Sequence, residues 1–155
     1  MTLLARIRTI VPDKIQITRP YWRDPLYIVW LLLGCSVAAL VGHFSIFSIG
    51  LYFSYANLLF IGVIYPILEE VTFRGFFMGL VLKFREARYS ISGISGANLL
   101  TTLCFTFFHW ATQQSVTAWW VIIPSLLFGW ARERYDSLIA PIILHICFNL
   151  VLIIF

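Results

Sequence analysis

The chain has 155 residues, of which 61% are hydrophobic and only 12% are charged. A soluble domain is about half apolar and about a quarter charged, so this composition, with a mean hydropathy of +0.89, excludes an ordinary water-soluble protein. The net charge of +4 comes from basic residues that flank apolar segments and form no single patch, which makes nucleic-acid binding a poor alternative. Several apolar runs are long enough to cross ~30 Å of hydrocarbon as helices. We therefore predict an all-α, polytopic transmembrane helix bundle with about five spans.

Residues 1–25 form a basic juxtamembrane arm in which prolines interrupt any long helix. We expect this arm to lie partly on anionic lipid. We expect no signal peptide, because no apolar core is followed by a small-residue cleavage site. A single membrane-embedded domain then occupies residues 26–155. Its expected spans are about 26–42, 56–82, 97–112, 116–131 and 137–155.

The connections between these spans differ in charge. Three basic residues lie between the second and third spans, and two lie in Arg132–Asp136, which is expected to form a tight turn before the fifth span. The apolar stretch 43–55, expected to be re-entrant or interfacial, and the turn after the third span contain no Lys, Arg, Asp or Glu. Cytoplasmic connections are enriched in Lys and Arg. The pattern therefore predicts a cytoplasmic N-terminus and a C-terminus on the other side of the membrane.

Two glutamates and an arginine lie inside the second span, in the sequence PILEEVTFRGFF, where Pro66 is expected to kink the helix. Unpaired charge in an apolar medium costs several kcal/mol, so these side chains need partners or a function. Glu70 and Arg74 are four residues apart and can pair on one helix face. Glu69 is rotated by ~100° around the helix and cannot share that geometry equally well. We expect Arg74 to neutralise Glu70, which leaves Glu69 to be explained.

The third and fifth spans also carry polar residues at helical spacing. Phe105 and His109 share one face of the third span. His145 and Asn149 share one face of the fifth. A single intramembrane His or Asn often links two helices, at ~0.6 to 2 kcal/mol, but this small bundle holds two carboxylates, two imidazoles and an amide. Such groups face the bundle interior, so we expect them to meet.

Together these groups supply the parts for adding water to an amide carbonyl. A carboxylate in an apolar pocket can act as a general base near neutral pH. An imidazole beside it can polarise the water or pass a proton to a leaving amine. N–H donors on an opposing helix can stabilise an oxyanion. No cysteine nucleophile is expected: Cys104 and Cys147 share no face well with the nearest histidine, and with Cys35 they are expected to be small buried side chains.

The three motifs resemble those of the CPBP family, the CAAX proteases and bacteriocin-processing enzymes, also called the ABI family, which are glutamate-type intramembrane proteases. The family's EExxxR followed by Gly, FxxxH and HxxxN occur here in that order, within about residues 60–150. The matching residues are Glu69, Glu70, Arg74, Gly75, Phe105, His109, His145 and Asn149. Before the last motif the family often has R-T-G-S-L-x-x-P. Here Tyr135 and Asp136 replace the usual Thr-Gly.

The resemblance implies a role for each of these residues. Glu69 would be the general base that activates water, and His109 would assist it. His145 and Asn149 would form the oxyanion hole. Glu70 and Arg74 would orient and support the site, and Phe105 would pack beside it. No metal or other cofactor is implied. The implied partners are the lipid bilayer and membrane-anchored, prenylated or peptide-tail protein substrates, and the implied location is a prokaryotic cytoplasmic membrane.

Three other functions are compatible with the same residues. His109, His145 and a glutamate would give a zinc metalloprotease three ligands and an open position, although the sequence lacks H-E-x-x-H. A non-catalytic membrane binding or immunity protein would keep the fold but would not need an intact acid–base set. A proton-coupled carrier would also use buried Glu and His, but no internal repeat is evident. We favour an intramembrane endopeptidase.

Overall fold

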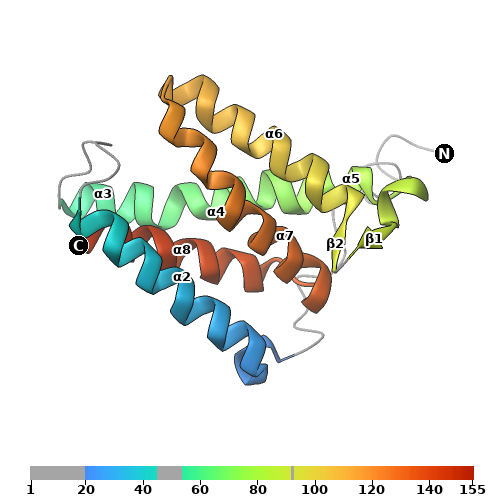
Figure 1. Cartoon of the computed structure of the whole chain (residues 1–155), viewed down its shortest axis with the longest axis horizontal. Helices are drawn as coiled ribbons and strands as arrows, with labels where there is room; N and C mark the ends of the chain where they lie inside the picture. Colours follow the sequence, from blue (N-terminus) through green and yellow to red (C-terminus); the bar gives the residue numbers. More distant parts are fainter. Residues whose placement is uncertain (1–19, 45–53, 92) are drawn as a thin grey trace.

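The computed structural model describes residues 20–44, 54–91 and 93–155. Its described part is an all-α bundle with one short hairpin (Figure 1), which confirms the all-α part of the predicted class. The arm before residue 20 and most of the predicted re-entrant stretch 43–55 lie outside the described residues. Two helical segments of the described chain are long and apolar enough to cross a membrane, Pro25–His43 and Tyr55–Val81. Ile139–Ile154 is apolar but shorter.

Helix α2 (Pro25–His43) follows the 3-10 turn η1 (Tyr21–Arg23) and agrees closely with the first predicted span. Its start is fixed by Asp24, whose side chain accepts a hydrogen bond from the Leu26 amide at 2.9 Å. Proline at the first helical position suits this start, because its missing N–H would have had no partner there. The apolar side chains of α2 are largely exposed in the structure, as expected of a helix that faces lipid.

The second span is a continuous helix over Tyr55–Val81 that changes type along its length. It contains α3 (Tyr55–Leu59), the π-helical η2 (Phe60–Ile64), α4 (Tyr65–Glu70), the π-helical η3 (Val71–Phe77) and α5 (Met78–Val81). The disturbance near Pro66 therefore takes the form of a π-helical turn before the proline. Such turns re-register the backbone bonds, and they are frequent at functional sites.

The predicted loop after the second span contains local structure. The 3-10 turn η4 (Glu86–Arg88) precedes the antiparallel hairpin β1 (Ser90–Ile91) and β2 (Ile94–Ser95). Helix α6 (Gly96–Gln113) follows at once, capped by Ser95, whose hydroxyl accepts from the Asn98 amide at 3.0 Å. Helix α6 thus agrees with the third predicted segment within one residue at each end, but among the described helices it is not one of the two that are long and apolar enough to cross a membrane.

The fourth predicted span begins where the structure has it, at Val116, but ends four residues too early. It begins as a 3-10 helix, η5 (Val116–Val121), and continues as α7 (Ile122–Tyr135). The predicted charged turn at Arg132–Asp136 is wrong: Arg132 to Tyr135 are helical, and the chain turns at Asp136, which has φ 46°. Asp136 lies four residues after Arg132 and accepts a hydrogen bond from it at 3.0 Å. This pair supports one more helical turn. The chain then enters α8 (Ile139–Ile154).

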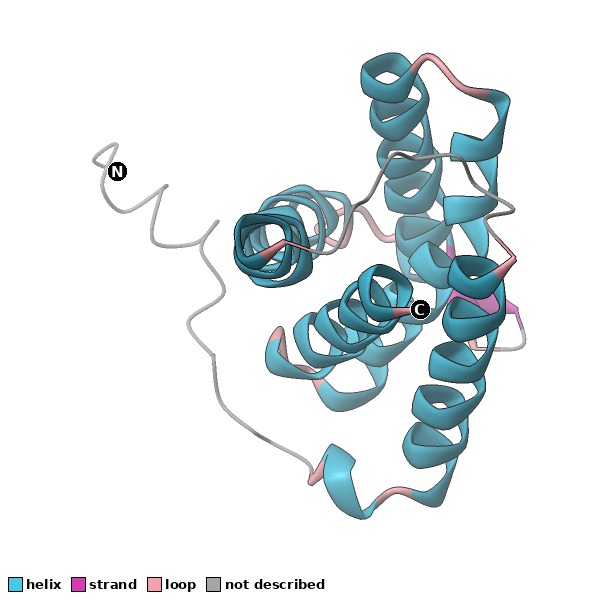
Figure 2. Ribbon diagram, turned by 90° about the vertical axis from the view of Figure 1, so that its left-hand side faces the viewer, coloured by secondary structure: helices cyan, strands magenta, loops and turns pink. Residues whose placement is uncertain are grey.

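Helix α8 is the centre of the bundle. It packs against α2, against α7 and against the second span, while α6 packs along α7. Figure 2 shows α8, which ends at the C label, surrounded by the other helices. Where α2 meets α8 the Phe148 ring lies against the Gly34 backbone, because a Cβ on Gly34 would lie 2.0 Å from that ring. The three cysteines are free, and the side chains that were expected to be buried are only half-buried.

A polar anchor joins the start of α2 to the end of α7. Asp24 Oδ2 accepts hydrogen bonds from Arg134 Nε at 2.9 Å and from the Tyr135 hydroxyl at 2.8 Å. Burial alone would raise the pKa of Asp24, but these bonds and the one from the Leu26 amide outweigh it and lower that pKa. The same site raises the pKa of Tyr135 to about 12, through burial first and then its bond to Asp24.

We expect Asp24→Ala to lower the melting temperature in detergent more than Asp24→Asn does. Loss of a helix N-cap costs ~1 kcal/mol, and asparagine caps as well as aspartate, while an exposed ion pair contributes only ~0–1 kcal/mol. Because the folded-state pKa is lowered, the Asp24 contribution is present above the unfolded value of about 3.9. It is lost as the pH falls through the still lower folded value. Equal melting temperatures for the two variants would contradict the capping role.

Candidate active site

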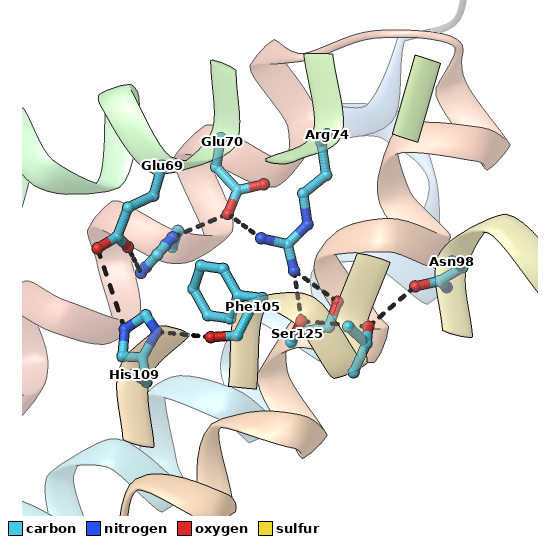
Figure 3. Close-up of polar contacts among 9 residues, drawn as sticks. Glu69, Glu70, Arg74, Asn98, Phe105, His109 and Ser125 are labelled. Carbon is cyan, nitrogen blue, oxygen red and sulfur yellow. Dashed lines mark hydrogen bonds and ion pairs between the residues drawn. The ribbon is translucent and has the colours of Figure 1, made fainter. Parts of the chain in front are cut away.

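The two adjacent glutamates of the second span have different environments. Glu70 and Arg74 are fully buried, and Arg74 Nη1 donates to Glu70 Oε1 at 3.0 Å. This confirms the predicted pairing. The side chain of Glu69 is 22% exposed and is directed toward His109, beside Glu70 and away from Arg74 (Figure 3). The helical rotation between neighbouring residues therefore separates a neutralised carboxylate from an accessible one.

Glu69 lies between two histidines from different helices. His109 Nε2, on α6, is 4.0 Å from Glu69 Oε1, and His145 Nε2, on α8, is 3.6 Å from Glu69 Oε2. Each carboxylate oxygen thus faces a different imidazole (Figure 3). Both separations exceed the usual hydrogen-bond length of about 3 Å. A single water molecule is able to contact a carboxylate oxygen and an imidazole nitrogen at these distances.

His109 is oriented by its own helix. Its Nδ1 lies 3.1 Å from the Phe105 carbonyl oxygen, and a carbonyl only accepts, so this nitrogen carries the proton. The Phe105 ring packs against the imidazole with centroids 4.3 Å apart. The predicted shared face of the FxxxH motif is confirmed. The lone pair of a neutral His109 then lies on Nε2, on the side of Glu69.

His145 is oriented by a carboxylate. Its Nδ1 is 2.9 Å from Glu70 Oε1, the same oxygen that accepts from Arg74. Because the oxygen also accepts a bond from the Arg74 guanidinium, Nδ1 is the donor in this contact. The imidazole stacks on Phe128 with centroids 4.6 Å apart and an interplanar angle of 21°. Glu70 therefore holds the ring while Nε2 is directed at Glu69.

Asn149 lies one helical turn beyond His145, and both line the same cavity. Its Nδ2 donates to the Ile61 carbonyl at 2.9 Å. In a π-helix, a carbonyl accepts a hydrogen bond from the N–H of the residue five positions later. For Ile61 that residue is Pro66, which has no N–H. The Asn149 amide supplies the missing donor. One of its two N–H groups is engaged in this way, and the other has no partner among the described residues.

The site opens into one large apolar cavity of about 1180 Å³. Its wall is built by apolar side chains of α2, α6, α7 and α8. The polar side chains of the predicted motifs on its wall are Glu69, His109, His145 and Asn149. A carboxylate and two imidazoles thus face a space that has the size of a ligand pocket and apolar walls.

Three polar residues behind the site were missed by the sequence analysis. Arg74 Nη2 donates to the Ser125 carbonyl at 3.0 Å and to its hydroxyl at 2.6 Å. Ser125 in turn contacts Thr102, and Thr102 contacts Asn98. A signal was present in the sequence, since Ser, Thr and Asn inside apolar helices commonly bond across helices. Nothing in their spacing indicated Arg74 as the partner.

Within the residues that the structure describes, no group of three or more His, Cys, Asp or Glu side chains is arranged to hold a metal ion. The zinc hypothesis would need such a group from His109, His145 and a glutamate.

One comparison with known proteins gives a match. The family model described as type II CAAX prenyl endopeptidase Rce1-like matches residues 51–151, about two-thirds of the chain. The matched range includes every residue of the three motifs. No curated protein and no solved structure matches the chain.

We expect Arg74→Ala to destabilise the protein strongly. It leaves Glu70 buried and unpaired, and breaking a buried pair in this way costs about 3–5 kcal/mol. Thermal unfolding in detergent measures the effect. Arg85→Ala is the matched control, because Arg85 is exposed in the loop after the second span. A melting temperature of the Arg74 variant equal to that of the control would contradict the structural role of the pair.

Proposed function

The chain belongs to the Rce1-like family of type II CAAX prenyl endopeptidases, and from this premise we propose that Glu69 activates water to hydrolyse a peptide bond at the membrane. Family membership makes the protein a hydrolase, an intramembrane protease. The proposal concerns which residues carry the reaction. The observation that carries it is the position of Glu69: each of its oxygens faces the Nε2 of a different histidine, at 4.0 and 3.6 Å.

The first step uses Glu69 and His109. A water molecule bound between the carboxylate and the imidazole loses a proton to Glu69, and its oxygen attacks the peptide carbonyl carbon. His109, with Nδ1 held by the Phe105 carbonyl at 3.1 Å, accepts a hydrogen bond from the same water through Nε2. The carbonyl oxygen becomes an oxyanion as the new C–O bond forms.

The second step uses His145 and Asn149. His145, whose Nδ1 is held by Glu70 at 2.9 Å, donates to the oxyanion through Nε2 in the form of the ring that carries a proton there. The second N–H of the Asn149 amide is a further donor. The intermediate collapses, the C–N bond breaks, and the proton held by Glu69 passes to the leaving amine. Arg74 and Glu70 support this arrangement from behind, and Phe105 packs beside it.

We propose that the reaction needs no metal ion. Glu69 takes the proton from the attacking water, a task that a bound metal ion assists in metalloproteases. The glutamate-type proteases of the family work without a metal ion.

The family and the two long apolar helices make the protein an integral membrane protein. We propose five spans with a cytoplasmic N-terminus, a basic arm over residues 1–25, and one protease domain over residues 26–155 in a prokaryotic cytoplasmic membrane. The charge asymmetry of the connections supports this orientation. The family acts on proteins with C-terminal CAAX-like tails. For this chain we propose membrane-anchored, prenylated or peptide-tail proteins, whose apolar part the cavity of about 1180 Å³ would accept.

We expect Glu69→Gln to abolish cleavage of a co-expressed membrane-anchored candidate substrate while the protein still folds and inserts. Glutamine keeps the shape but removes the base. Glu86→Gln is the matched control, since Glu86 is exposed in η4. Cleavage by wild type should continue with a zinc chelator. Normal turnover by the Glu69 variant would contradict the proposed mechanism. Loss of cleavage in the presence of the chelator would favour a zinc metalloprotease.

We expect Asn149→Ala to reduce turnover by roughly 10²–10³-fold, the cost of losing one oxyanion donor. It should also lower stability by ~1–3 kcal/mol, because the Ile61 carbonyl loses its partner. Steady-state kinetics and thermal unfolding separate the two effects. An unchanged rate in a folded variant would remove Asn149 from the oxyanion hole.

A further inference from the structure

The guanidinium of Arg74 is held from two sides. One side carries Glu70, and the other carries Ser125 of α7, whose carbonyl and hydroxyl both accept from Nη2, at 3.0 and 2.6 Å. The flat faces of the guanidinium lie against aromatic rings, with Cζ 4.5 Å from the Phe105 centroid and 5.4 Å from that of Phe128. Both hydrogens of Nη2 are therefore used on Ser125, which fixes how far Arg74 reaches toward Glu70.

Ser125 is itself held by α6. Its hydroxyl accepts from Arg74, so its own hydrogen is available, and it donates to Thr102 Oγ1 at 3.1 Å. The Thr102 hydroxyl donates to Asn98 Oδ1 at 3.3 Å, and Asn98 Nδ2 donates back to the Leu126 carbonyl of α7 at 3.0 Å. Figure 3 shows this row of side chains running away from Arg74. Each hydroxyl donates once, so the donors all point in one direction.

The packing of α6 on α7 is shaped for this row. Asn98, Thr102 and Ser125 are all fully buried. A Cβ on Gly129 would lie 1.9 Å from Asn98 Oδ1, so only glycine allows the Asn98 side chain to lie against α7. Burying a polar side chain costs free energy unless it is hydrogen-bonded. Here every side chain of the row is hydrogen-bonded, and the row ends at the Arg74 cation next to the site.

We propose that Ser125, held by Thr102 and Asn98, is a positioning residue for His145. Ser125 fixes Arg74, and Arg74 fixes the Glu70 carboxylate. Glu70 then holds His145 by Nδ1, at 2.9 Å, and leaves Nε2 directed at Glu69. Ser125 touches neither the cavity wall nor the reacting atoms. Its part in catalysis rests on the proposed function, but the orientation of His145 is testable without any substrate.

The first test measures the protonated nitrogen of His145. The full chain has three histidines, so labelling with [¹⁵N]histidine in detergent micelles gives few ring signals, and His145→Gln identifies the one from His145. We expect a single signal set with Nδ1 protonated in the wild type. In Ser125→Ala we expect this set to be lost and replaced by signals averaged between the two ring nitrogens, in a protein that still unfolds cooperatively.

Two neighbouring threonines of α6 provide a matched pair of variants. Thr102→Val removes the hydroxyl on which Ser125 depends. Thr101→Val removes an equally buried hydroxyl, which donates to the Ala97 carbonyl of its own helix at 2.7 Å. Valine keeps the shape of threonine in both. We expect Thr102→Val to shift the His145 signals in the same direction as Ser125→Ala, and Thr101→Val to leave them unchanged.

The second test uses a substrate cleaved in a Glu69-dependent way. We expect kcat to fall about 10- to 100-fold in Ser125→Ala, in line with loss of a hydrogen bond to a charged group, with KM unchanged. Thr102→Ser, which keeps the hydroxyl, should retain wild-type kcat.

If the wild type cleaves nothing, the proposed function fails while the NMR result still decides the positioning role. Wild-type His145 signals in folded Ser125→Ala overturn the proposal. If that variant does not fold, identical signals in Thr102→Val and Thr101→Val overturn it.

Discussion

The buried ion pair between Glu70 and Arg74 is the constraint on which the rest of the site depends. Removing two charges from water is expensive, and the cost is recovered only where geometry and further hydrogen bonds are good. Here Glu70 also accepts from His145, and Arg74 also donates to Ser125. The pair therefore ties the second span to α8 on one side and to α7 on the other. The link to α8 sets the distance between the helices that present Glu69 and His145.

The backbone of the second span contributes a second constraint. Pro66 removes a donor, and the π-helical η2 before it leaves the Ile61 carbonyl to be satisfied from another helix. Asn149 of α8 satisfies it at 2.9 Å. Pro66 in the helix Tyr55–Val81 and Asn149 in α8 thus belong to one interaction. It draws α8 toward the second span one turn away from His145, so the same helix face packs and presents the site.

Much of this architecture could be predicted because it depends on local periodicity. The pairing of Glu70 with Arg74, the separate direction of Glu69 and the bounds of α2 and α6 all follow from the helical repeat and from apolar length. The end of α7 could not be read in this way, because Arg132 and Asp136 look like loop residues until their i, i+4 pair is seen to continue the helix. The bonds of Ser125 and of Ile61 depend on which helices become neighbours. One sequence shows that polar atoms exist there, but it does not show which atom each one meets.

The arrangement of charge connects these constraints to the proposed chemistry. With both glutamates ionised and Arg74 cationic, the site holds one excess negative charge, and a proton on either histidine cancels it. When Glu69 takes a proton from water, that negative charge passes to the substrate oxyanion and the total is unchanged. His145 Nε2 lies 3.6 Å from Glu69 Oε2, so it lies close to the negative charge before and after this transfer. His145 is held in place by Glu70 and Arg74, so it reorients little as the charge moves. Preorganised sites stabilise the transition state mainly by avoiding such reorganisation.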